Sequence, residues 1–92
     1  MKKLLDHLHK YGNVYNTEDS ALFFYALTKM QQYSLFVEFG TGLACTSLAV
    51  ATAMKENNKG SCITYDNGSH FKNVNDYKNF LNSLIKKHKL VN

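Results

Sequence analysis

The sequence has no arginine, and all eleven of its basic residues are lysines. Arginine has the planar, five-donor fork that suits guanine edges and phosphates, so its absence removes the usual basis for reading nucleic acid. The lysines are spread along the chain, apart from a small group at Lys86, Lys87 and Lys89. We therefore interpret the net charge of +4 as a solvated surface and expect no nucleic-acid partner.

Cysteine is scarce, and long hydrophobic runs are missing. Cys45 and Cys62 fall in different predicted elements without metal-site spacing, which favours reduced thiols in a cytoplasmic protein. No apolar run reaches the roughly 18 residues that a membrane-spanning helix needs. The first residues, MKKLLDHLHK, alternate apolar with polar positions and do not resemble a signal peptide. The sequence thus predicts a cytoplasmic chain with no membrane partner.

The length of 92 residues fits one small domain, residues 1–92, and a composition of 45% hydrophobic and 20% charged residues is typical of a folded chain. Its first part, 1–33, predicts two helices. The first covers 2–11, with leucines along one face. The second begins at Asn16 or Thr17, continues to about residue 31, and is apolar on so many sides that we expect it to be mostly buried.

A strand–helix–strand unit is predicted over residues 35–66. The run 35–39 is apolar except for Glu38, which is typical of a parallel strand covered on both faces. Small residues predict a helix over about 45–57, ended by Gly60, and 61–65 predicts the second strand. Aromatic residues in and before this unit are expected in the core: Phe23, Phe24, Tyr25, Phe36 and Phe39.

The last predicted element is a helix over 73–90, which gives an α/β chain in the order α-α-β-α-β-α. The two strands must be parallel, because a helix connects them. Two strands leave open sheet edges and apolar faces. We therefore expect the fold to be completed by self-association or by a second chain that supplies the missing strands.

Two glycines follow the first strand in the stretch Phe39-Gly40-Thr41-Gly42, and such a turn lets a ligand approach the backbone. The N-terminus of the next helix favours an anionic group. Asp66 closes the second strand at the same sheet edge, where a carboxylate can hold a ribose diol. A dinucleotide site is the alternative, but its G-x-G-x-x-G pattern fails at Cys45, and Glu38 would repel a pyrophosphate.

The segment VEFGTGLACTSLAVATAM, followed by a glycine and then CITYD, resembles the first motif of class I S-adenosylmethionine-dependent methyltransferases. It is most similar to the O-methyltransferase branch. The resemblance covers roughly residues 17–70, the N-terminal half of such an enzyme, and implies a partial Rossmann-like fold. Ala44 replaces a third glycine that many members have.

The resemblance implies a cofactor, S-adenosylmethionine, and a role for each matching residue. Gly40 and Gly42 would meet the methionine part, and Glu38 would lie near its amino group. Asp66 would hold the ribose hydroxyls. The remaining two positions are Thr41, which would line the pocket, and Asn67, which would border the adenine.

No catalytic residue and no metal site follow from the sequence. His7 and His9 lie two positions apart on a helix and are expected to be solvated. His70 has no visible partner for general-base work, and Cys45 is best explained as a small buried residue. The function predicted is binding of S-adenosylmethionine, with methyl transfer to a small molecule in a completed assembly. Two alternatives stay open: a non-catalytic homo-oligomeric nucleoside-binding module, and an enzyme that cleaves the same cofactor.

Overall fold

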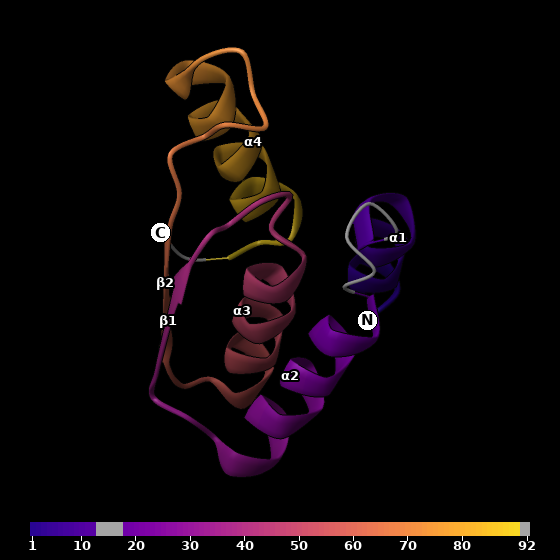
Figure 1. Cartoon of the computed structure of the whole chain (residues 1–92). Coiled ribbons are helices and arrows are strands. Elements are labelled where there is room, and N and C mark those ends of the chain that lie inside the picture. Colours follow the sequence, from indigo (N-terminus) through magenta and orange to yellow (C-terminus); the bar gives the residue numbers. More distant parts are fainter. Residues whose placement is uncertain (13–17, 91–92) are drawn as a thin grey trace.

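Two parallel strands lie beside each other, and helices pack against one side of them (Figure 1). The computed structural model describes residues 1–12 and 18–90. The predicted order of elements and the parallel pairing are confirmed. The elements are α1 (Lys2–Tyr11), α2 (Glu18–Gln31), β1 (Leu35–Phe39), α3 (Cys45–Asn57), β2 (Ser61–Tyr65) and α4 (Val74–Lys87).

The register of the sheet places the ends of both strands at one edge. Leu35 is opposite Ser61, and Phe39 is opposite Tyr65. The turn that follows β1 and the turn that follows β2 are therefore neighbours, as the carboxyl ends of parallel strands must be. This register brings the glycines after β1 close to the acid after β2.

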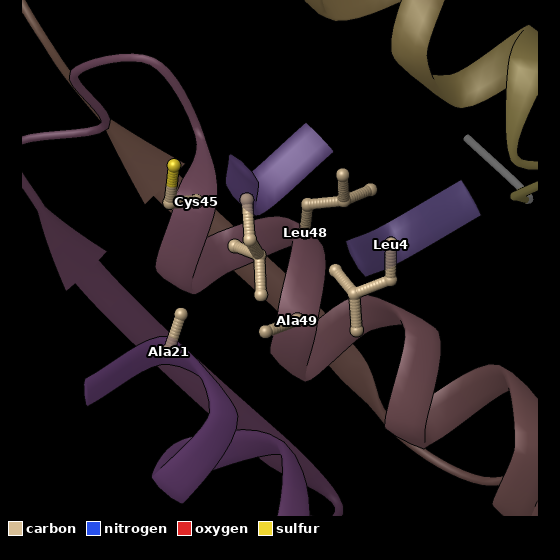
Figure 2. Close-up of a cluster of buried hydrophobic side chains, with 6 residues drawn as sticks. Leu4, Ala21, Cys45, Leu48 and Ala49 are labelled. Atoms are coloured by element: carbon tan, nitrogen blue, oxygen red, sulfur yellow. The ribbon is translucent and has the colours of Figure 1, made fainter. Parts of the chain in front are cut away.

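The core is centred on α3, whose small side chains allow other helices to approach closely. Leu4 and Leu8 of α1 pack with Leu48 and Ala49 of α3, and Ala21 contributes from α2 (Figure 2). Ala49 and Ala21 are completely buried. An alanine-rich helix surface brings backbones together, so α3 is the element on which α1 and α2 are both positioned.

One face of the sheet is open, so the prediction that the first strand is covered on both faces is wrong. The side chains along each strand alternate between half-buried and exposed. Phe36 and Glu38 point toward the helices, whereas Leu35, Val37 and Phe39 are exposed on the other face. The apolar run was a correct sign of a strand, but the described residues supply only one layer of helices.

The expected burial of α2 is also wrong. Its buried residues are Ala21 and Thr28, while Phe23 is 61% and Met30 is 76% exposed. The reason is that α2 lies at the outside of the layer and contacts the rest of the chain through one narrow surface. The predicted aromatic core accordingly fails at Phe23, Phe24 and Phe39, which are all exposed. The rings of Phe24 and Phe36 still lie with centroids 6.2 Å apart.

The helix ends differ from the predicted ones in detail. Asn73 caps α4 by accepting a hydrogen bond from the N–H of Asp76, at 2.8 Å, and α4 ends at Lys87 rather than at residue 90. The predicted caps Asn16 and Thr17 lie outside the described residues. No helix of the described chain has the length and apolar character needed to cross a membrane.

The end of α3 uses two residues with positive φ, and only one of them is the predicted glycine. Asn58 takes the left-handed position that ends the helix, with φ of 54°. Gly60 follows with φ of 113°, and a Cβ there would lie 2.9 Å from both the Met54 sulfur and the Tyr33 carbonyl oxygen.

We expect Gly60→Ala to lower the free energy of unfolding by roughly 1–3 kcal/mol, because it adds backbone strain and a clash with a backbone oxygen. Urea unfolding followed by circular dichroism measures the change. Gly42→Ala is the matched control, since no atom lies within 4 Å of a Cβ there. Equal losses in both variants would contradict the role assigned to the Gly60 contact.

Candidate functional site

The turn after β1 is built from residues in the left-handed region. Gly40 and Gly42 have φ of 94° and 55°, and Ala44, which precedes α3, has φ of 66°. The N–H of Gly40 donates to the Tyr65 carbonyl at 2.7 Å, which fixes the start of the turn against β2. No heavy atom lies within 4 Å of a Cβ built at either glycine. Packing within the described chain therefore does not fill the space that these glycines leave.

Asp66 lies beside this turn, as the sequence predicted. Its Oδ2 accepts a hydrogen bond from the Gly42 N–H at 2.9 Å, and its Oδ1 accepts one from the N–H of Asn67 at 2.7 Å. The carboxylate thus joins the two turns at the sheet edge. Asn67 faces elsewhere, because its own side-chain oxygen accepts from the Ser69 N–H at 2.9 Å.

A cavity of about 250 Å³ opens at this edge. Five of the six predicted site residues line it, and Asn67 does not. Two acids face the cavity, and among the described residues no lysine lines it. The lining residues are Glu38, Gly40, Thr41, Gly42, Leu43, Cys45, Thr46, Asp66 and His70.

Glu38 is held by a chain of hydroxyl groups that reaches across to α4. Thr64 donates to Glu38 Oε1 at 2.8 Å, and its oxygen is 2.5 Å from that of Thr41. The hydroxyl of Tyr77 donates to the Thr41 oxygen at 2.9 Å. Each hydroxyl carries one proton, so Thr41 must donate to Thr64. All hydrogen bonds in the chain therefore point toward the Glu38 carboxylate, and they fix its position in the cavity.

Burial raises the pKa of the Glu38 carboxyl, and the nearby negative charge of Asp66 raises it further. Hydrogen bonds from Thr64 and Ser47 oppose this rise because they stabilise the ionised form. A cation placed between the two acids would be attracted by both. The site is thus organised for a positively charged or zwitterionic ligand group.

The N-terminus of α3 forms the other wall of the cavity. Ala44 precedes the helix, and no side chain caps it. Cys45 and Thr46 of the first turn line the cavity. Backbone N–H groups at the start of a helix favour a carboxylate or another anion. An anionic group fits here, separated from the two acids at the strand ends.

The sequence did not identify two of the residues that organise the site. Thr64 could have been found from the register, because it is the strand partner of Glu38 on the same sheet face. Tyr77 had no local signal: it is 36 residues from Thr41 and reaches the turn only because α4 folds back over it. Among the described residues, no group of three acidic, histidine or cysteine side chains could hold a metal ion.

His7 of α1 contacts the turn after β1, and the prediction that it is solvated is wrong. It is buried, and its Nε2 lies 2.8 Å from the carbonyl oxygen of Leu43. A carbonyl only accepts, so Nε2 carries the proton. The ring centroids of His7 and His88 are 6.3 Å apart. The buried Nε2 of His88 has no hydrogen-bond partner among the described residues.

Burial lowers the pKa of both His7 and His88 from the ordinary value of 6.5, and lysines near each ring lower it further. Between the folded and unfolded pKa values, the unfolded chain therefore binds more protons than the folded one. The contribution of the two neutral histidines to the free energy of unfolding is therefore fully present above pH 6.5 and is lost as the pH falls below that value.

We expect the free energy of unfolding to decrease between pH 7.5 and 5.5, measured by urea unfolding in steps of half a pH unit. Glu38 has the opposite effect on the free energy of unfolding: because its pKa is raised in the folded chain, its contribution increases as the pH falls. The variant His7→Gln isolates the histidine effect and should show a smaller decrease. Identical pH profiles for wild type and His7→Gln would refute the assignment.

Comparison of the chain with protein-family models, with curated proteins and with solved structures gives no match. The interpretation of the site therefore depends on its own geometry and chemistry.

Proposed function

We propose that the cavity at the carboxyl ends of β1 and β2 binds S-adenosylmethionine. The observation that supports this most strongly is the pair of carboxylates, Glu38 and Asp66, beside a glycine turn where no heavy atom of the described residues lies within 4 Å of a Cβ built at either glycine. S-adenosylmethionine carries an amino group and a sulfonium, both cationic, a carboxylate and a ribose diol. The amino group, the carboxylate and the ribose diol each have a chemically matched partner at the site.

The matched partners are distinct residues. Glu38 suits the ammonium group, and Asp66 suits the ribose hydroxyls, each of which can donate to a carboxylate oxygen. The uncapped N-terminus of α3 suits the ligand carboxylate. The cavity of about 250 Å³ is smaller than the roughly 300–1,000 Å³ typical of ligand pockets, so the described residues enclose part of such a ligand.

The same features disfavour a dinucleotide. A pyrophosphate beside Glu38 and Asp66 would meet two negative charges with no lysine lining the cavity to offset them. The distinction between the two ligand classes is thus electrostatic and does not depend on the glycine spacing alone.

We propose further that the chain takes part in methyl transfer to a small molecule once a second chain or a second copy supplies the acceptor side of the site. The residues of this chain bind and orient the cofactor, and orientation of the methyl group toward a nucleophile is the main requirement of such a transfer. A non-catalytic nucleoside-binding module is the second candidate. It is favoured by the small volume of the cavity, about 250 Å³, in which the described residues enclose only part of a nucleoside ligand.

Thermal unfolding with different ligands tests the proposal. At about one hundred times its dissociation constant, a ligand stabilises the folded chain by about 2.7 kcal/mol, which for this size raises the midpoint by roughly 14 °C. We expect such shifts with S-adenosylmethionine and S-adenosylhomocysteine, and none with NAD.

Gly42→Ala is the matched variant for this experiment, because its Cβ would project into open space beside the turn. It should abolish most of the ligand-induced shift, measured against the variant's own midpoint without ligand, because alanine at φ of 55° costs about 1–2 kcal/mol of strain. A shift with NAD alone, or no shift with any of the three ligands, would refute the proposed ligand.

A further inference from the structure

The open sheet face consists of Leu35, Val37 and Phe39 on β1 with Ser61, Ile63 and Tyr65 on β2. All six side chains are exposed, and none carries a charge. Phe39 is 82% exposed, and its ring stacks on that of Tyr65 with centroids 5.3 Å apart. Figure 1 shows α2 and α3 on the opposite side of the sheet.

An uncharged face of this kind is unusual on a monomer. Parallel sheets are normally covered on both faces, and cores of protein interfaces are rich in aromatic residues and poor in charge. A compact monomer of 10.5 kDa exposes about 5,400 Å². This chain exposes 5974 Å², although its radius of gyration, 12.3 Å, is that of a compact domain. The excess, about 550 Å², belongs to the surface of the whole chain, and Phe39, Leu35 and Tyr65 of the open face, 82%, 58% and 54% exposed, contribute to it.

We infer that two copies of this chain associate through their open sheet faces. A specific interface needs roughly 1,000 Å² in all, so each copy has to bury about 500 Å² of this face and its rim. The absence of charge on the face matters for this choice of partner. Each copy has a net charge of +4, yet two copies in this arrangement bring no like-charged side chains of the sheet into contact.

The shape of the face is also self-complementary. Its rows change in size along the strands, from Leu35 beside Ser61 at one end to the stacked rings of Phe39 and Tyr65 at the other. A two-fold axis between the sheets, running across the strands, places the aromatic end of one copy over the smaller end of the other. Such an axis passes over the middle row, Val37 and Ile63. Each middle-row residue then faces the same residue of its partner, as a symmetric interface requires.

Sedimentation equilibrium of the full chain, without ligand, tests this inference independently of the proposed cofactor. We expect a mass twice that of the 10.5 kDa chain at high protein concentration, dissociating on dilution. Phe39→Lys should be monomeric at the highest concentration. Phe23→Lys replaces a similarly exposed ring on α2, in the layer on the other side of the sheet, and should still dimerise.

Circular dichroism shows whether each lysine variant is folded, and a second variant keeps the test decisive if Phe39→Lys is not. Sheets packed face to face lie about 10 Å apart, too far for a disulfide, so a short bismaleimide should cross-link Val37→Cys between copies. The wild type, whose Cys45 is buried and Cys62 half-buried, should not be cross-linked. A monomeric wild type at all concentrations would overturn the inference. So would a dimer that Phe23→Lys abolishes, or a folded Phe39→Lys that still dimerises.

Discussion

Replacing Asp66 by alanine should weaken S-adenosylmethionine binding by about 1–3 kcal/mol, a loss of roughly 5- to 150-fold in affinity. The carboxylate of Asp66 contributes in two ways. It offers acceptors to the ribose diol, and it holds the Gly42 N–H at 2.9 Å, which positions the glycine turn. Isothermal titration calorimetry of the wild type and the variant measures the difference.

Asp76→Ala is the control for this prediction, because Asp76 is an exposed acid on α4 and does not line the cavity. It should bind the ligand as the wild type does. Asp66→Asn retains one carbonyl acceptor and should lie between the wild type and Asp66→Ala. An unchanged affinity in Asp66→Ala, with the fold intact, would remove Asp66 from the site.

Leu8→Ala should lower the free energy of unfolding by about 2–5 kcal/mol, the range for a fully buried leucine that leaves a cavity. A domain of this length has a total stability of about 5–14 kcal/mol, so the loss is a large fraction of it. Leu8 is 0% exposed and packs in the cluster that joins α1 to α3 (Figure 2). Urea unfolding gives the value directly.

The same substitution at Leu5 provides the control, since Leu5 lies on the same helix but is only half-buried. Leu5→Ala should lower the free energy of unfolding clearly less than Leu8→Ala does. Both variants have the same change in helix propensity, so that effect cancels in the comparison. Because His7 of α1 contacts the Leu43 carbonyl, Leu8→Ala should also weaken ligand binding. Equal costs at Leu5 and Leu8 would contradict the proposed docking of α1.

Local patterns in the sequence were sufficient for the elements and for the residues that meet at the carboxyl edge of the sheet. Gly40 and Gly42 after an apolar run marked the turn, and Asp66 after the second run marked the same sheet edge. These signals succeed because they depend on backbone conformation and on the geometry of a parallel strand pair, which are fixed within a few residues.

Tertiary contacts decided the features that the sequence did not predict. An apolar strand can be covered on one face or on two, and the pattern of β1 does not distinguish these cases. His7 was interpreted from its polarity, but its burial depends on contacts with residues 36 and more positions away. Tyr77 was not identified and Asn67 was misplaced for the same reason, since the fold of α4 and of the turn after β2 sets their directions.

The most direct measurement is a calorimetric titration of S-adenosylhomocysteine into the wild-type chain near neutral pH, with NAD titrated in parallel. The proposed site predicts saturable heat with one ligand bound per chain, and no saturable heat from NAD. The absence of heat from S-adenosylhomocysteine at millimolar concentration, in a chain that circular dichroism shows to be folded, would contradict the account.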